Sequence, residues 1–203
     1  MILDLLAPAL CWSCGAPAAR GEPLCRACRS SLRFLGLEPV ALGGVAVWAP
    51  VAYEGAAASL VKGLKFCGAT ALAHTMAALV VANAPAGMLA GALVPVPAHP
   101  ARRRRRPFNQ AELIAEAIVA RTHLPLLDRL RRTGPDQRQV GRGRTARLSA
   151  AGSIEATGRS PPRVLLVDDV VTTGATLGAC AAALREAGAQ RVAAVAFART
   201  MGR

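Results

Sequence analysis

The chain has 203 residues, of which 53% are hydrophobic and 18% are charged. This composition is sufficient for a buried core and excludes an intrinsically disordered chain, and the length suits one domain with a small addition. Its 25 Lys and Arg residues exceed its 12 Asp and Glu residues by 13. We therefore expect attraction to polyanions such as nucleic acid, an acidic membrane surface or a phosphorylated small molecule.

No segment is predicted to cross a membrane. The longest apolar stretch, residues 76–98, is interrupted by Asn, Gly and Pro residues and lacks a continuous apolar run. The first residues, MILDLLAPALC, carry Asp4 where a signal peptide would carry positive charge. We therefore expect a cytoplasmic protein without membrane insertion.

Four of the six cysteines follow a metal-ligand pattern, in which Cys11-x-x-Cys14 and Cys25-x-x-Cys28 are separated by ten loop-like residues. Two such paired knuckles supply four thiolates for a tetrahedral zinc ion. Disulfide bonds or unliganded buried thiols are the alternatives, but a reducing cytosol disfavours the first and the paired spacing disfavours the second. The pattern predicts a structural zinc site.

A zinc ion with four protein ligands has no open position for catalysis, so its expected role is to fold about 35 residues that cannot build a core alone. We place this zinc module at residues 1–38 and a second domain at residues 39–203. The remaining cysteines, Cys67 and Cys180, lack such spacing, and we expect both to be small buried hydrophobic residues.

Strands and helices are predicted to alternate along the second domain. We expect strands at residues 45–53, 92–97, 124–130, 163–168 and 191–197, and helices from Gly55 onward and at residues 69–82, 109–121 and 175–187. Gly63 and Gly68 bracket Lys65 and predict a loop there. Residues 131–149, rich in Gly and Arg without apolar periodicity, predict a mobile loop. The alternation favours an α/β fold with a parallel sheet flanked by helices.

The stretch VLLVDDVVTTGATL, residues 164–177, carries the most specific signal. Its apolar strand is predicted to end at Asp168 and Asp169, and ligands of parallel sheets bind beyond the carboxyl ends of the strands. Threonine hydroxyls and backbone N–H groups then precede a helix start, whose partial positive charge favours a phosphate monoester.

A ribose 5-phosphate satisfies both features, with its hydroxyls donating hydrogen bonds to the two carboxylates and its phosphate in the threonine loop. The simpler alternative is a helix whose N-cap is Thr172 or Thr173, with both acids solvated. That alternative explains one threonine but neither the acid pair nor the other threonines, so we favour the sugar phosphate.

The same stretch resembles the phosphoribosyl pyrophosphate (PRPP) motif of type I phosphoribosyltransferases. With LKFCG (64–68), PVPAHPARRRRRPFNQAELIA (95–115) and the four cysteines in the same order, nearly the whole chain resembles the ComF family of competence-type proteins. The resemblance implies a type I phosphoribosyltransferase fold with a small N-terminal zinc-ribbon module that has four cysteine ligands. It also implies a role in DNA uptake and natural transformation, with a DNA-uptake helicase as a partner.

The resemblance assigns roles to individual residues. Asp168 and Asp169 would bind the ribose hydroxyls, and Lys65 would face the leaving diphosphate. The 5-phosphate would be held by Thr172, Thr173, Gly174, Ala175 and Thr176. Mg²⁺ would bind mainly pyrophosphate and ribose oxygens. In a transferase, the aspartates would stabilise positive charge on the sugar, Lys65 with Mg²⁺ would stabilise the leaving group, and Asp169 could also accept a proton.

Three functions follow as hypotheses. The first is a Mg²⁺-dependent phosphoribosyltransferase with an unknown acceptor, and the second is a non-catalytic PRPP-binding protein of DNA uptake. Pro107 and Ala150 replace the glycine and asparagine of the family pattern, which bears on turnover more than on PRPP binding. The third is a zinc-dependent nucleic-acid adaptor without ligand chemistry, which leaves the acid pair unexplained.

The arginine run Arg102–Arg106 has three interpretations. It is a solvated basic loop, a contact surface for the backbone of single-stranded DNA, or a group of cations that neutralises the diphosphate of PRPP. Only 3% of residues are aromatic, so any binding of single-stranded DNA should depend on phosphate contacts and weaken steeply with salt.

Overall fold

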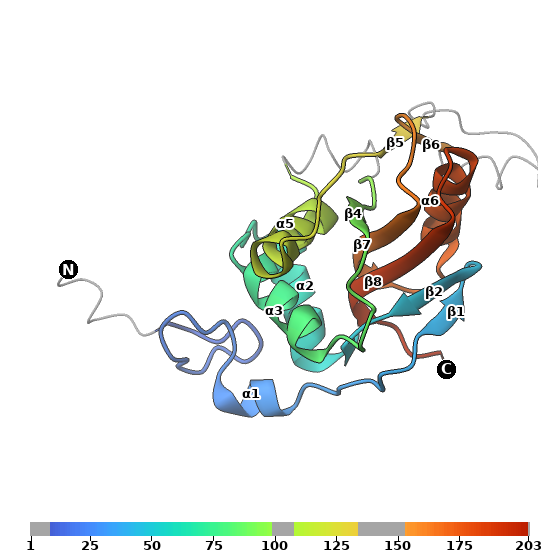
Figure 1. Ribbon diagram of the computed structural model, residues 1–203. Coiled ribbons are helices and arrows are strands. Elements are labelled where there is room, and N and C mark those ends of the chain that lie inside the picture. Colours follow the sequence, from blue (N-terminus) through green and yellow to red (C-terminus); the bar gives the residue numbers. More distant parts are fainter. Residues whose placement is uncertain (1–8, 99–107, 134–152, 203) are drawn as a thin grey trace, which may run out of the picture.

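The computed structural model describes residues 9–98, 108–133 and 153–202. In this part of the chain the main sheet has six strands in the order β1-β2-β8-β7-β4, and β3 also pairs with β8 (Figure 1). These strands are β1 (Val40–Leu42), β2 (Val45–Trp48), β3 (Val51–Ala52), β4 (Ala92–Pro95), β7 (Arg163–Val171) and β8 (Arg191–Arg199). A separate two-stranded ribbon pairs β5 (Leu130–Thr133) with β6 (Ser153–Ala156).

The main sheet is mostly parallel. Strands β2, β8, β7 and β4 pair parallel to one another, whereas β1 pairs antiparallel with β2 at the edge. The longest ladder joins β7 to β8 and runs from Arg163 opposite Arg191 to Val171 opposite Arg199. The α/β fold with helices flanking a mostly parallel sheet is confirmed.

Helices cover both faces of this sheet, as parallel sheets require. In Figure 1, α2, α3 and α5 lie on one face, α6 lies on the other, and α1 lies apart, next to the N-terminal loops. The helices are α1 (Arg26–Ser30), α2 (Gly55–Phe66), α3 (Leu72–Asn83), α5 (Gln110–Thr122) and α6 (Ala175–Glu186). Within the described residues, none of the helices is long and apolar enough to span a membrane.

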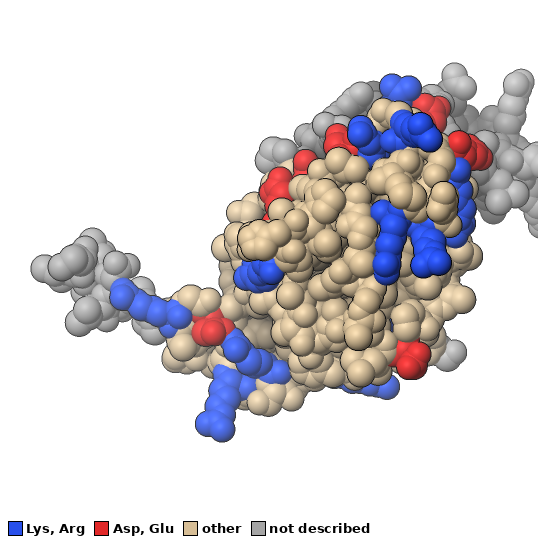
Figure 2. Space-filling view, in the orientation of Figure 1, with Lys and Arg blue, Asp and Glu red and all other residues tan. Residues whose placement is uncertain are grey.

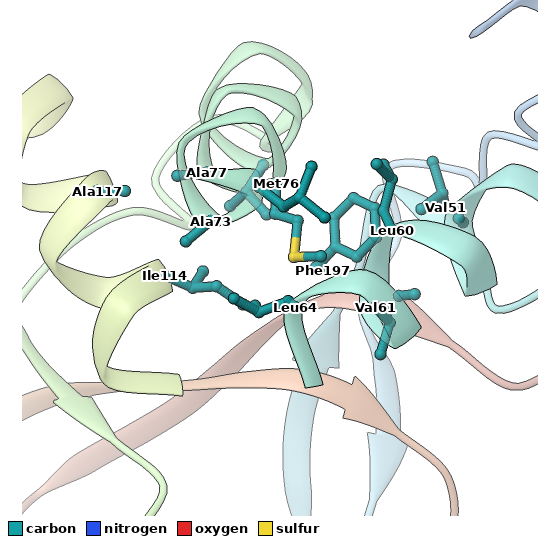
Figure 3. Packing of buried hydrophobic residues seen from close by; sticks show 14 of the residues in the cluster. Val51, Leu60, Val61, Leu64, Ala73, Met76, Ala77, Ile114, Ala117 and Phe197 are labelled. Atoms are coloured by element: carbon teal, nitrogen blue, oxygen red, sulfur yellow. The ribbon is translucent and has the colours of Figure 1, made fainter. Parts of the chain in front are cut away.

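Two hydrophobic clusters lie on the two faces. Successive residues of a strand project to opposite sides, so Leu165 and Val167 of β7 join the cluster beneath α2, α3 and α5, while Leu166 joins the cluster beneath α6. Figure 3 shows the first cluster, in which helices and strand β8 contribute Leu60, Leu64, Met76, Ile114 and Phe197. These two clusters hold the carboxyl ends of the strands in place, where the functional site lies.

Several predicted strands have different bounds in the structure. The strand expected at residues 45–53 is divided into β2 and β3 at Ala49–Pro50, because proline cannot donate a ladder hydrogen bond. The strand expected at residues 124–130 is wrong, since Leu126 makes only an isolated bridge to Leu93 and β5 begins at Leu130.

The loop predicted around residues 131–149 is wrong at its start, because Arg131, Arg132 and Thr133 belong to β5 and pair with β6. Strand β6 has too short a pattern to be predicted from the sequence alone. Residues 134–149 of the predicted loop lie outside the described part of the chain.

The loop predicted at Lys65 is also wrong, because α2 continues through Gly63 to Phe66. Gly63 serves packing rather than a turn, since a Cβ atom built there would lie 2.7 Å from Leu72 Cδ1 and 3.0 Å from the Trp12 ring. The turn comes later, at Gly68, whose φ of +66° suits glycine. Lys65 therefore lies in the last turn of a helix, on a rigid element.

Candidate functional site

A cavity of about 390 Å³ lies at the carboxyl ends of β7 and β4. Parallel sheets commonly place ligand sites at this edge. Its wall combines the acid pair, threonines from the loop after β7, residues after β4, the start of α5, one residue of β5 and one of α2. The lining side chains include Tyr53, Lys65, Val96, Asn109, Gln110, Arg132, Asp168, Asp169, Thr172 and Thr176. The structure thus brings residues of several separate segments to one concave surface.

Asp168 and Asp169 lie inside β7 rather than beyond its end. The strand predicted to stop at Asp168 continues to Val171, which pairs with Arg199 of β8. As neighbours in a strand, the two carboxylates project to opposite faces of the sheet. Both nevertheless line the cavity, because β7 ends only a few residues later.

Asp169 forms an ion pair with Lys65 of α2, through its Oδ2 atom and the Lys65 ammonium nitrogen. The side chains are only 9% and 19% exposed, respectively. The ammonium group predicted to face a diphosphate is thus already paired with a carboxylate of the cavity. Because a buried charge needs a partner, this contact compensates for the burial of both groups and links α2 to β7.

Asp168 has a different electrostatic environment, on the side of the sheet covered by α6. Burial, followed by the negative charge of Asp169, raises the pKa of Asp168 to about 8. The backbone N–H of Asp169 donates a 2.8 Å hydrogen bond to Asp168 Oδ1, which opposes the increase without cancelling it. The two adjacent carboxyl groups therefore lie in different environments, and the raised pKa of Asp168 favours its protonated form in the absence of a cation.

The loop after β7 leads into α6 as an open helix start. The N-cap is Gly174, with φ of 77°, so the alternative with Thr172 or Thr173 as the N-cap is wrong. Thr172 and Thr173 are exposed, α6 begins at Ala175, and Thr176 lines the cavity together with Thr172. Threonine hydroxyls and first-turn N–H groups therefore meet at the positive end of a twelve-residue helix, which suits an anion.

The turn between β1 and β2 supports this loop from behind. A Cβ atom built on Gly43 would overlap the carbonyl oxygen of Gly174, and one built on Gly178 would lie 2.5 Å from the carbonyl oxygen of Gly43. Glycine is needed at these positions because two backbones touch. The conformation of the loop between β7 and α6 therefore depends on a turn that is distant in the sequence.

Gln110 and Arg132 are among the cavity residues that the sequence-based predictions did not include. Gln110, the first residue of α5, is 8% exposed, and among the described residues its Nε2 atom has no hydrogen-bond partner. The buried Nε atom of Arg132 is likewise without a partner in that part of the chain. A buried donor without an acceptor costs about 1–3 kcal/mol, so these two donors of the cavity wall are candidate contacts for a ligand. The sequence does not show whether a single side-chain atom is buried or whether it has a hydrogen-bond partner.

The neighbouring Asn109 has a structural role instead. Its Oδ1 atom accepts a 3.2 Å hydrogen bond from the N–H of Ala111, and its Nδ2 atom donates one of 3.0 Å to the carbonyl oxygen of Val96. Asn109 thus caps α5 and ties it to the segment after β4. This arrangement orients the start of α5, and with it Gln110, toward the cavity.

The four predicted zinc ligands converge in space. The sulfur atoms of Cys11, Cys14, Cys25 and Cys28 all lie within 4.8 Å of one another. The Cys14 and Cys25 sulfurs are 3.7 Å apart, which is close to the separation of about 3.8 Å that tetrahedral Zn–S bonds of about 2.3 Å impose. The donor set therefore fits a structural zinc ion with no position left for substrate.

Backbone hydrogen bonds act on the Cys11 thiol in the direction opposite to burial. Burial would raise the pKa of Cys11, but backbone N–H groups, first that of Cys25 and then those of Cys14 and Ser13, lower it to about 6. Of the other two cysteines, only Cys67 differs from the prediction. Cys180 is buried as expected, whereas Cys67 is exposed, because it follows directly on the end of α2.

The predicted basic loop Arg102–Arg106 and the substituted positions Pro107 and Ala150 lie outside the described residues. In Figure 2, Lys and Arg side chains lie near β5 and β6, along the side of the molecule that carries α6, and around α1. The visible positive charge is therefore distributed over separate parts of the molecule.

Comparison with known proteins covers both parts of the chain. Residues 126–203 match the phosphoribosyl transferase domain, and residues 2–40 match the double zinc ribbon domain. Competence protein F of Haemophilus influenzae is 33% identical over 107 residues, which are 50% of this chain and 47% of that protein. Competence protein ComFC of Bacillus subtilis is 37% identical over 98 residues, which are 47% of this chain and 39% of that protein.

Together, these matches support a ComF-family protein. The order of features agrees with the resemblance inferred from the sequence, with a zinc-ribbon-like cluster of four cysteines first and a phosphoribosyltransferase domain after it. The matched regions span less than half of the length of these two ComF relatives. The match to the double zinc ribbon domain and the four-cysteine cluster suggest a structural zinc site.

Proposed function

We propose that this protein binds PRPP in the cavity at the end of β7. The observation that carries the proposal is the meeting of Asp168 and Asp169 with Thr172 and Thr176 on one concave surface. The 5-phosphate binds the threonines and the start of α6, and the ribose 2- and 3-hydroxyls donate hydrogen bonds to the carboxylates. Thr173, Gly174 and Ala175 complete the phosphate loop with their backbone N–H groups.

The diphosphate end has further candidate partners besides Lys65, which the sequence predicted to face it. Lys65 lines the cavity and pairs with Asp169, so in this proposal it acts on the ligand mainly through that carboxylate. Gln110 Nε2 and Arg132 Nε are buried donors that lack acceptors within the described chain, and both residues line the cavity. An anion with many oxygen acceptors would satisfy both donors, and the N-terminus of α5 adds favourable charge.

In this proposal, Mg²⁺ enters the cavity bound to PRPP. It would neutralise the diphosphate and bind mainly its oxygens and those of the ribose. The nearby Asp168 carboxyl group, with its raised pKa, would lose its proton more readily beside a divalent cation. The predicted Mg²⁺ dependence is therefore an expected property of PRPP binding rather than of a preformed metal site.

Whether the bound PRPP reacts is a separate question. In a transferase, departure of pyrophosphate leaves positive charge on the sugar, and Asp168 and Asp169 lie where they could stabilise it. A non-catalytic sensor would use the same contacts without turnover. Pyrophosphate release from PRPP and Mg²⁺, measured with a panel of nucleobases, separates the two, since a sensor releases none with any base.

At the cellular level we propose a ComF-like role in DNA uptake and natural transformation, since the matched relatives are both competence proteins. A helicase of DNA uptake is the partner that this role implies. The alternative is an adaptor that binds single-stranded DNA through Arg102–Arg106. A gel-shift series with single-stranded DNA at rising salt tests it, because backbone-driven binding must weaken steeply with salt.

The decisive experiment is calorimetric titration of the full chain with PRPP and Mg²⁺. The Asp168→Asn/Asp169→Asn double variant should lose at least about tenfold in affinity, since hydrogen bonds to charged groups contribute about 1.5–3 kcal/mol each. Asp128→Asn, at an exposed position outside the cavity, is the matched control and should bind normally. Unchanged PRPP affinity in the double variant would show that the site assignment is wrong.

A further inference from the structure

A second concave surface lies at the opposite end of the strands from the PRPP cavity. It is a groove of about 720 Å³, within the roughly 300–1,000 Å³ that small-molecule sites span. Its basic side chains are Arg163, Arg185 and Arg191, and its one acidic side chain among the described residues is Glu38. Three positive charges against one negative charge leave the groove cationic.

Two of these arginines are neighbours in the sheet. Arg163 begins β7 and Arg191 begins β8, and they are Cα partners in the parallel ladder. Paired residues of a ladder project to the same face, and like charges placed opposite each other are destabilising. The ladder therefore begins with a repulsive pair.

Among the described residues, no carboxylate forms an ion pair with the arginines of the groove. The ion pairs in this part of the chain join Arg29 with Glu22, Arg33 with Glu54, Lys65 with Asp169 and Arg131 with Glu155. Arg163, Arg185 and Arg191 belong to none of them. A positive cluster that forms no ion pair with the carboxylates of the described residues is a candidate site for an external anion.

Hydrogen bonds to the backbone hold two of the three guanidinium groups. Arg163 Nη2 donates to the carbonyl oxygen of Gly87 at 2.9 Å, and Arg185 Nη2 donates to that of Gly44 at 3.3 Å. A guanidinium group has five N–H donors in a fixed plane, so each retains further donors. Groups held in this way lose less conformational entropy when they bind a phosphate.

Apart from the arginines, Glu38 and Gln190, the groove is lined by apolar residues and Gly87. Leu37, which is 62% exposed, Pro39 and Met88 contribute to its wall, together with Pro85 and Val192. If an inorganic anion bound to the arginines, this apolar surface would remain exposed to water. A ligand with both a phosphate group and a flat apolar part would cover it, because apolar contact adds to the charge-assisted hydrogen bonds.

We propose that this groove is a second phosphate-binding site, for a nucleotide whose phosphates bind Arg163, Arg185 and Arg191 and whose base packs on the apolar wall. The site is separate from the PRPP cavity and does not depend on the proposed function. Phosphate groups are also present in the backbone of nucleic acid, so the experiment must distinguish a free nucleotide from an oligonucleotide.

The test is calorimetric titration of the full chain with ATP at moderate salt, using Arg191→Gln as the main variant. Unlike Arg163 and Arg185, the Arg191 side chain donates no hydrogen bond to a backbone carbonyl of the described residues. Loss of one charge-assisted contact should weaken ATP binding about tenfold. Arg121→Gln, an exposed arginine of α5 outside the groove, should bind ATP normally. Asp168→Asn should also bind ATP normally, since it alters only the PRPP cavity.

Thermal unfolding provides an independent measurement. Without ligand, Arg191→Gln should raise the Tm by about 1–3 °C, because it removes the repulsion from Arg163. The same variant should lose the increase in Tm that ATP causes in the unmodified protein. A variant that was merely misfolded would instead show a lower Tm.

Three results would overturn the proposal. The first is no ATP binding at millimolar concentration, and the second is equal weakening by Arg191→Gln and Arg121→Gln, which would indicate unspecific charge attraction. The third is that Arg191→Gln weakens the binding of an oligothymidylate but not the binding of ATP. This result would assign the arginines to a nucleic-acid backbone instead.

Discussion

The carbonyl oxygen of Gly174, at the start of α6, lies directly against Gly43 in the turn between β1 and β2. The two backbones approach so closely that a single added carbon on Gly43 would overlap this oxygen. The loop proposed to hold a phosphate is therefore shaped by contact with the edge of the sheet as well as by its own threonines.

Substitution of Gly43 by alanine tests this contact. Gly43 and Gly44 both have positive φ, of +59° and +74°, but a Cβ on Gly44 meets nothing within 4 Å. Gly44→Ala should thus lower the free energy of unfolding only by the backbone strain, about 1–2 kcal/mol. Gly43→Ala should lower it clearly more. Chemical denaturation measures the difference, and PRPP titration should show weakened binding for Gly43→Ala alone. Equal effects of the two variants would contradict a role for the contact.

The ion pair between Lys65 and Asp169 predicts a strong and asymmetric mutational effect. Lys65→Met leaves a buried carboxylate unpaired and should lower the free energy of unfolding by about 3 kcal/mol. Adding Asp169→Asn should restore much of this loss, which a double-mutant cycle measures. Lys62→Met, at an exposed position of the same helix, is the control. If Lys65 only contacted solvent, both lysine variants would behave alike.

The raised pKa of Asp168 predicts a pH dependence of stability. Its pKa of about 8 in the folded protein exceeds the ordinary value of 3.8, so the folded state binds this proton more tightly than the unfolded state. The resulting stabilisation is complete below pH 4 and is lost as the pH rises toward 8. In urea denaturation without Mg²⁺ or PRPP, Asp168→Asn should flatten this decline. A decline of the same slope in Asp168→Asn would assign it to other groups.

Gln110 should affect stability and binding in opposite directions. Gln110→Leu removes a buried donor that has no partner among the described residues, and it should stabilise the ligand-free protein by about 1 kcal/mol. The same change should weaken PRPP binding about tenfold, because the diphosphate loses a hydrogen bond. Gln190→Leu, at an exposed position outside the cavity, should leave PRPP affinity unchanged. Normal PRPP affinity in Gln110→Leu would exclude Gln110 from the site.

The zinc cluster predicts a defined metal content. Cys25→Ser should lose zinc and unfold the cysteine-rich segment, while Cys67→Ser, outside the cluster, should keep the metal. The loss of structure should extend to α3, because the Trp12 ring packs beside Gly63 and Leu72. Metal analysis and tryptophan fluorescence measure these effects. A fully folded Cys25→Ser variant without metal would rule out structural zinc.

Some of these features could be predicted from local pattern. The Cys-x-x-Cys pairs predicted the sulfur cluster because the two cysteines of each pair meet in a single turn. Apolar runs bounded by turn residues predicted β4, β7 and β8, since buried parallel strands have this composition. Short elements such as β5 and β6 were not predicted, because four-residue strands are stabilised by their partner more than by their own residues.

The sequence by itself therefore determined the α/β class, the cysteine cluster and the acid–threonine stretch, each of which depends on residues close together in the chain. Only the tertiary structure decided that Lys65 pairs with Asp169, that Gln110 and Arg132 are donors without acceptors among the described residues, and that Gly43 supports Gly174. These relations join distant segments whose separation depends on how helices and strands pack. The physical reason is that burial, charge pairing and backbone contact are properties of the packed chain, and no local pattern encodes them.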